Sequence, residues 1–214
     1  MVVRPKPVRR PVIPPEVAER VPPGQFLTQR WPVLHYGDVP PFDPRLWDFK
    51  VYGCVERPLR LSWDEFSALP SVEIQADMHC VTRWSKLDNR WGGVLARTLL
   101  ERAGLTAEAA FVVFQCERGY TANLPLDVVL GDDVLFATTH DGETLPPEHG
   151  FPVRAVVPQK YAWKSAKWLR AVEVLPEDRL GFWENYGYNS NADPFREERF
   201  ADAEEPGDPS DEPT

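Results

Sequence analysis

Apolar and polar residues alternate along several short stretches of the chain, and this period of two predicts β-strands. The first such stretch is residues 47–55, which ends before the turn at Pro58. Residues 72–76 alternate in the same way and lead directly towards Cys80, so we expect Cys80 at the end of a strand. Further strands are expected at residues 111–116, 134–138, 153–157 and 169–174.

Helical patterns are confined to two short stretches. Ser62 and Glu65 have the spacing of a capping box, and Pro70 ends the short helix that they introduce. A longer helix is predicted over residues 93–103, with Gly104 as its C-terminal stop. Strands outnumber helices and do not alternate with them, so the expected class is α+β, with mixed, mainly β sheets and few short helices.

Composition divides the 214 residues into three parts. Residues 1–24 are rich in Pro and Arg without periodicity, which predicts an extended Pro-rich arm. Residues 201–214 are acidic and rich in Pro, which predicts a disordered tail. The remaining residues, 25–200, are numerous enough to bury a sizeable core, and we expect them to form one catalytic domain.

Charge and cysteine content exclude several classes of protein. The net charge of -9 argues against binding nucleic acid through a broad basic surface. No apolar run approaches the ~18 residues that a membrane span needs, and the N-terminal residues lack the apolar core of a signal peptide. The three cysteines form no pair with the spacing of a zinc or dithiol motif, and their odd number fits a reducing compartment. We therefore expect a cytoplasmic protein without nucleic-acid partners or a membrane span.

The segment HCVTRWS, residues 79–85, carries the first candidate for chemistry. Arg83 lies three residues after Cys80, and a nearby cation favours the thiolate, the form of cysteine that attacks electrophiles or binds a metal. The alternative is that Cys80 is a small buried apolar side chain, as most free cysteines are. His79 is a candidate ligand or a polar loop residue, but neighbours in an extended chain point to opposite faces. We therefore do not expect His79 and Cys80 to bind one metal.

Positive charge is concentrated in residues 145–168 of this otherwise acidic chain. The segment contains Arg154, Lys160, Lys164, Ser165 and Lys167. Cations beside a hydroxyl group are suited to binding phosphate. The alternative is a solvated basic face, but such a face would not require the three aromatic residues that stand between the charges. We favour a pocket for a phosphate or another anion.

The segments HCVTRWS and LPPEHGFPVRAVVPQKYAWKSAKWLRAVEVL together resemble the oxidoreductase molybdopterin-binding domain, which sulfite oxidases share with the catalytic subunit of bacterial methionine sulfoxide reductases. The resemblance covers about residues 31–200, and the order and separation of the two motifs make it specific. The stretch GFWENYGYNSNADPFREERF resembles the closing segment of cytoplasmic sulfite-oxidase-like members. The resemblance implies a sulfite-oxidase-type fold with molybdenum and molybdopterin as cofactors.

The resemblance also implies roles for matching positions. Cys80 matches the cysteine that binds molybdenum, and Arg154 matches a position that holds the pterin and its phosphate. Cys116 falls where a relative has threonine. Arg83 departs from the methionine sulfoxide reductase branch, where an acidic residue is expected, and a cation there would favour an anionic or strongly polar substrate. We expect Cys80 and Arg83 to be catalytic. The expected cofactor contacts are His35, His79, Cys80, Cys116, His149, Arg154, Ala162, Trp163, Lys164, Ser165 and Lys167.

The implied reaction is a two-electron oxygen-atom transfer to or from a small oxo or sulfur-containing substrate. The sequence lacks the cytochrome and immunoglobulin-like domains of full sulfite oxidases, so we expect a separate electron-transfer partner. Two alternatives stay open. One is a cysteine hydrolase with Cys80 as nucleophile and His140 or His149 as base, although no known protease signature surrounds Cys80. The other is a non-enzymatic interaction module with an aromatic binding surface.

Overall fold

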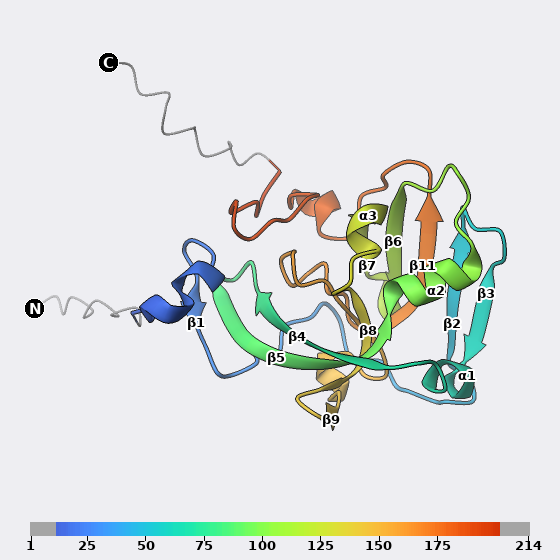
Figure 1. The fold of residues 1–214 in the computed structure, drawn as a ribbon, viewed down its shortest axis with the longest axis horizontal. Helices are drawn as coiled ribbons and strands as arrows, with labels where there is room; N and C mark the ends of the chain where they lie inside the picture. The colour runs from blue at the N-terminus through green and yellow to red at the C-terminus, as the bar shows by residue number, and fades with distance from the viewer. Residues whose placement is uncertain (1–11, 202–214) are drawn as a thin grey trace, which may run out of the picture.

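The computed structural model describes residues 12–201. Residues 1–11 of the predicted N-terminal arm and residues 202–214 of the predicted tail lie outside the described residues. Within 12–201 the chain forms two β-sheets with few, short helices (Figure 1). This confirms the predicted α+β class with mixed, mainly β sheets. No helix in the described range is both long enough and apolar enough to cross a bilayer.

The main hydrophobic core packs against a five-stranded sheet. Its strands are β2 (Asp48–Gly53), β3 (Leu59–Ser62), β6 (Phe111–Cys116), β7 (Thr121–Pro125) and β11 (Leu169–Leu175), in the order β3-β2-β11-β6-β7. β11 is parallel to β2 and antiparallel to β6, so the sheet is mixed. Alternate side chains such as Phe49, Phe114 and Val172 are fully buried in this core. The burial of one face explains the period of two in these sequences.

The second sheet is built on one long strand, β5 (Trp84–Leu95). β5 pairs with β4 (Val72–His79) and β8 (Leu135–His140) on its two sides, and with the short β1 (Phe26–Leu27) at its start. β9 (Glu143–Thr144) and β10 (Arg154–Val156) pair with β8. Figure 1 shows β5 as a curved ribbon that runs from beside β1 to the start of α2. β4 and β5 therefore form a hairpin, and Cys80 stands at its turn.

The capping-box prediction is confirmed at α1 (Trp63–Ser67). Ser62 Oγ accepts a hydrogen bond from the Glu65 amide at 3.3 Å, and Glu65 Oε2 accepts one from the Ser62 amide at 2.8 Å. The reciprocal bonds satisfy main-chain donors that a helix start leaves free. A third helix, α3, spans Leu126–Val129. Short 3-10 helices span Pro15–Arg20, Glu117–Gly119, Pro147–His149 and Glu184–Tyr186.

The predicted start of the longer helix was wrong. α2 spans Ala96–Ala103, and Gly93 belongs to β5 instead. A Cβ atom at Gly93 would lie 2.2 Å from the carbonyl oxygen of Phe136, so the close pairing of β5 with β8 requires glycine there. The predicted stop at Gly104 is confirmed, because this residue ends the helix with a φ of 72° that favours glycine.

The segments at both ends of the described chain pack onto the β4–β5 hairpin. Arg20, in the 3-10 helix Pro15–Arg20, forms ion pairs of 2.7 Å with Asp77 and with Asp88. On the C-terminal side, Arg199 Nη1 donates to the carbonyl of Val81, in the turn of this hairpin, at 2.7 Å. The part of the predicted arm that the structure describes therefore contains a helical turn and is attached to the domain.

Candidate functional site

A pocket of about 340 Å³ lies where the two sequence motifs meet. Its lining includes seven of the residues expected from the sequence: His35, Cys80, Arg154, Ala162, Trp163, Ser165 and Lys167. Five other expected residues do not line it: His79, Arg83, Cys116, His149 and Lys164. Most of the remaining lining is aromatic or aliphatic. A largely apolar pocket with a few convergent polar groups is typical of a small-molecule or cofactor site.

The main chain joins the two motifs directly. The carbonyl of His79 accepts a hydrogen bond from the amide of Ala162 at 2.8 Å. The amide of Cys80 donates to the carbonyl of Trp84 and the amide of Arg83 donates to the carbonyl of Cys80, both at 2.9 Å, which closes the turn between β4 and β5. This turn sets Cys80 against the loop that carries the basic segment.

Cys80 and His79 occupy different surfaces, as expected for neighbours at the end of a strand. Cys80 lines the pocket, whereas His79 lines a separate groove together with Asp77 and Gln75. The imidazole of His79 is buried and is hydrogen-bonded through Nδ1 to Ser85 Oγ at 2.8 Å. His79 therefore supports the turn and does not share a ligand position with Cys80.

The thiol of Cys80 is buried and has a polar neighbour. Thr82 Oγ1 donates a hydrogen bond to Cys80 Sγ at 3.2 Å. Burial raises the pKa of Cys80 above its ordinary value, while Thr82 and the cations Arg199 and Lys167 act to lower it. A metal ion at this thiol would add a much larger positive charge and favour the thiolate.

Arg154 is a buried cation without a carboxylate partner. Its side chain is 2% exposed, and its guanidinium donates to the carbonyls of Ala155, His149 and Ser165 at 3.3, 3.0 and 2.8 Å. No carboxylate oxygen of the described residues lies within 4.0 Å of it. Burial lowers the pKa of Arg154 to about 9. An uncompensated buried cation on a pocket wall is suited to an anionic ligand.

Lys167 places a second cation at the pocket. Its Nζ donates to the carbonyls of Leu34 and Glu148 at 2.9 and 2.7 Å. Burial, and then the charge of Arg154, lower the pKa of Lys167 to about 7. Trp84 also lines the pocket, and its buried Nε1 has no hydrogen-bond partner within residues 12–201. The pocket thus combines two basic side chains with largely apolar walls, which is chemistry suited to an anionic cofactor.

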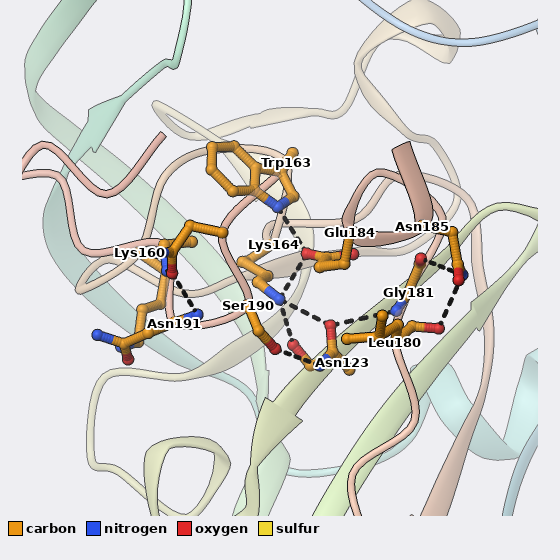
Figure 2. Close-up of polar contacts among 12 residues, drawn as sticks. Asn123, Lys160, Trp163, Lys164, Leu180, Gly181, Glu184, Asn185, Ser190 and Asn191 are labelled. Carbon is orange, nitrogen blue, oxygen red and sulfur yellow. Dashed lines mark hydrogen bonds and ion pairs between the residues drawn. The ribbon is translucent and has the colours of Figure 1, made fainter. Parts of the chain in front are cut away.

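Lys164 is held inside the protein (Figure 2). Its Nζ donates to the main-chain and side-chain oxygens of Asn123 at 2.7 and 2.9 Å, and it forms an ion pair of 2.6 Å with Glu184. An ammonium group has three N–H donors, so these contacts occupy all of them. Lys164 was expected to contact the cofactor, but this arrangement leaves it no donor for a phosphate.

The same network holds a pocket wall in place. Trp163 Nε1 donates to Glu184 Oε1 at 2.8 Å, and the ring of Trp163 lines the pocket (Figure 2). Lys160, also in the basic segment, donates to the side-chain oxygen of Asn191. The two lysines therefore attach the basic segment to the C-terminal residues, while Arg154 and Lys167 serve the pocket.

The remaining expected residues take different positions. His35 lines the pocket and its Nδ1 lies 2.9 Å from the carbonyl of Gly37. His149 stacks on Trp31 with ring centres 3.7 Å apart, and its buried Nδ1 has no partner among the described residues. Cys116 ends β6 away from the pocket lining, and burial raises the pKa of its thiol. Cys116 therefore does not share the pocket position of Cys80.

The geometry does not provide the pair that a cysteine hydrolase needs. Within the described chain, Cys80 Sγ has no hydrogen bond to a histidine. His140 is instead 2.9 Å from Asn89 Oδ1, and His149 is stacked on Trp31. A nucleophilic thiolate requires an adjacent base.

Several residues that line the pocket were not among those expected from the sequence: Trp31, Tyr36, Met78, Tyr120, Trp183 and Tyr188. Trp183 and Tyr188 lie in the aromatic stretch GFWENYGY. This stretch begins the segment that resembles the closing segment of cytoplasmic sulfite-oxidase-like members, but no pocket role was expected for it. Its density of aromatic residues was the available signal, because such residues commonly wall a buried ligand.

Most of this chain is similar to known proteins. The model of the family described as "oxidoreductase molybdopterin binding domain" matches residues 36–183. The chain is 50% identical over 182 residues to the uncharacterized oxidoreductase YuiH of Bacillus subtilis, covering 85% of this chain and 92% of that protein. It is 31% identical over 170 residues to the putative protein-methionine-sulfoxide reductase subunit YedZ1 of Azospira oryzae, covering 78% and 64% of the two chains.

More distant relatives are longer than this chain. Sulfite oxidase of Gallus gallus is 30% identical over 204 residues, and the match covers 78% of this chain but 44% of that enzyme. The crystal structure of the sulfane dehydrogenase SoxCD from Paracoccus pantotrophus matches with a TM-score of 0.62 and 22% identity, covering 67% of this chain and 41% of that one. The structural match supports the fold alone, and confirms the sulfite-oxidase-type architecture expected from the sequence.

Proposed function

Because this chain belongs to the oxidoreductase molybdopterin-binding domain family, we propose that it catalyses a two-electron oxygen-atom transfer to or from a small oxo or sulfur-containing substrate. The family assignment makes it a molybdopterin-dependent, sulfite-oxidase-like oxidoreductase that uses molybdenum. The observation that carries the proposal is the pocket that Cys80 lines together with two basic side chains, the buried Arg154 and the half-buried Lys167.

The residues of the pocket fit the cofactor. Arg154 and Lys167 have only main-chain carbonyls as hydrogen-bond acceptors, so a phosphate would complete their charge balance. Cys80 supplies a soft sulfur ligand, which suits a metal already held by sulfur. We therefore assign the metal-ligand role to Cys80 and the anion-binding roles to Arg154 and Lys167.

When bound, the cofactor supplies the oxygen-atom transfer and the two-electron chemistry. The chain's own residues orient and shield it. Thr82 donates to Cys80 Sγ and the closed turn fixes the direction of that sulfur. Aromatic side chains, among them Trp31 and Trp163, form the walls of the pocket. Walls of this kind exclude water and strengthen the electrostatic contacts made inside.

We also propose that the electrons are exchanged with a separate protein. One relative, YedZ1, is described as a subunit of a putative reductase, which supports such a division of labour. The domain family matches most of the described chain, from residue 36 to residue 183, and this range carries most of the residues that line the pocket.

Metal and pterin analysis tests the proposal. The protein would be produced in a bacterial host that makes molybdopterin, beside a molybdenum enzyme of known loading. We expect close to one molybdenum and one pterin per chain, measured by elemental analysis and by pterin fluorescence after oxidation. A folded protein that carries neither, from a host in which the control enzyme is fully loaded, would overturn the proposed function.

A further inference from the structure

The turn that carries Cys80 is held from outside by two side chains from distant parts of the chain. Gln25 Nε2 donates to the carbonyl of Cys80 at 3.1 Å. Arg199 Nη1 donates to the carbonyl of Val81 at 2.7 Å, across a sequence separation of 118 residues. Both side chains belong to residues that are only 6% exposed. Two consecutive carbonyls next to the reactive sulfur are thus fixed by buried donors.

We propose that Arg199, assisted by Gln25, is a positioning residue that sets the direction in which Cys80 Sγ meets the bound metal. The inference rests on the proposed function, in which Cys80 is the metal ligand. Arg199 itself does not line the pocket, so it acts through the main chain at Val81 and not by touching the cofactor.

The contacts of Arg199 are unlike those of a surface ion pair. Its Nε and Nη2 atoms are buried without hydrogen-bond partners in the described chain, and its carboxylate neighbour, Glu197, lies 3.6 Å away. Burying a cation in this way is unfavourable unless the position serves another purpose. The one hydrogen bond that the Arg199 side chain donates within the described residues goes to the carbonyl of Val81, next to Cys80.

Arg199 also connects this turn to the second motif. The centre of its guanidinium lies 4.9 Å from the ring centre of Tyr161. Tyr161 is fully buried and stacks on Trp163, a pocket wall, with ring centres 5.3 Å apart. A planar guanidinium can donate along its edge to Val81 while its face lies on Tyr161, which an ammonium or an amide cannot do equally well.

The turn itself needs such restraint. Arg83 closes it with a φ of 75°, a left-handed conformation that is unfavourable for a residue other than glycine. The N-terminal segment supports the same turn, because the amide of Phe26 donates to the carbonyl of Arg83 at 2.8 Å. Gly24 leads the chain into this contact with a φ of 70°, a conformation that favours glycine. The Cys80 turn is therefore held between the two outer segments.

The test compares Arg199→Gln and Arg199→Lys with Arg196→Gln as matched control. Arg196 lies on the same segment, but its side chain is 67% exposed and its ion pair with Glu198 is 3.7 Å long. Two quantities are measured on the protein as purified from the cofactor-producing host. One is hydrogen exchange at the amides of Cys80 and Arg83, which close the turn. The other is the absorption band from charge transfer between thiolate and metal.

For Arg199→Gln we expect exchange at the two turn amides to rise by about tenfold, because a charge-assisted hydrogen bond to the turn is lost. Exchange in β11, in the core of the other sheet, should stay at the wild-type rate. The charge-transfer band should shift or weaken at equal metal content. Arg199→Lys should be intermediate, because an ammonium can still donate to Val81, and Arg196→Gln should match the wild type.

Unchanged exchange and an unchanged band in Arg199→Gln would overturn the inference. Equal acceleration in the turn and in β11 would also overturn it, because this pattern indicates a general loss of stability. Failure of the proposed function is seen separately, as absence of molybdenum from the wild-type protein. In that case the turn-specific exchange still decides whether Arg199 holds the Cys80 turn.

Discussion

Lys164 and Glu184 form an ion pair of 2.6 Å in which neither side chain is exposed to solvent. Burial lowers the pKa of Lys164, and the charge of Glu184 opposes this shift. The pair attaches the second motif to the C-terminal segment, whose Trp183 and Tyr188 complete the pocket wall. The lysine that the sequence placed on the cofactor thus contributes to the pocket by holding its wall.

Removal of this lysine should reduce stability. Lys164→Met leaves Glu184 as an uncompensated buried charge, which should lower the free energy of unfolding by about 3–5 kcal/mol. Urea unfolding of the cofactor-free protein measures this loss. The double variant Lys164→Met/Glu184→Gln should recover part of it, since the unpaired charge is removed. A normal unfolding free energy together with poor cofactor retention would instead indicate a direct contact between Lys164 and the cofactor.

Cys80→Ser should leave the domain folded and abolish oxidoreductase turnover. A hydroxyl is a much poorer ligand than a thiolate for a soft metal centre, and its small size preserves the turn. Circular dichroism, molybdenum content and turnover are compared with those of Cys54→Ser, which changes a cysteine packed against the main core. Retained turnover in Cys80→Ser would contradict the ligand assignment.

Lys167→Gln should weaken cofactor retention more than it changes the chemical step. A contact to phosphate is made equally in the ground state and the transition state, so its loss affects binding. We expect about tenfold weaker retention, equivalent to about 1.4 kcal/mol. Pterin content after dialysis is the measurement, with the exposed Lys50→Gln as control. Full pterin content with reduced turnover per loaded site would argue for a role in the reaction.

The stability of the cofactor-free protein should depend on the protonation of His149. Burial, together with the charges of Lys167 and Arg154, lowers the pKa of His149 to about 4. Between this value and the ordinary pKa of about 6.5, the unfolded chain binds a proton that the folded protein does not. The free energy of unfolding should therefore fall as the pH decreases through this window, by at most about 3 kcal/mol from this residue.

Urea unfolding at about pH 6.5 and about pH 4.5 measures this effect in the wild type and in His149→Gln. The variant cannot take up the proton, so its loss of stability between the two pH values should be smaller. Equal losses in both proteins would show that His149 is accessible to protons in the folded state.

Arg83→Gln should leave substrate binding unchanged. Arg83 was expected to be catalytic and to favour an anionic or strongly polar substrate, but its side chain is exposed and does not line the pocket. Asp77 and Asp88, acidic residues of the same hairpin, are paired with Arg20 instead. KM for an anionic oxo compound and for a neutral sulfoxide should therefore match the wild-type values. A rise confined to the anionic compound would restore the substrate role of Arg83.

Local signals made parts of the fold predictable. The helix after Ser62 was found because its cap depends on residues three positions apart. β5 was missed because its sequence, WSKLDNRWGGVL, contains too many polar residues to indicate a buried strand. Its pairing with β1, β4 and β8 stabilises it, and those contacts are distant in sequence. The start of α2 was misplaced for the same reason, since the pairing of Gly93 with β8 overrides helical periodicity.

The candidate site was predictable where it depends on short motifs. Cys80 and Arg154 stood out because each lies in a segment with an unusual charge or thiol environment. The partner of Lys164 was not predictable, because nothing near Lys164 in the sequence indicates that Glu184 folds against it. The contribution of Trp31 and Tyr188 to one pocket likewise depends on how the two ends of the domain come together.

The walls of the pocket are synthesised at very different times. The ribosome makes Trp31 early, and Trp183 and Tyr188 only near the end of the described chain. A nascent chain that stops short of Tyr188 lacks part of the lining of the pocket. A cofactor delivered during translation would therefore encounter an incomplete pocket. Binding in an enclosed pocket requires that the C-terminal segment has emerged and packed against the domain.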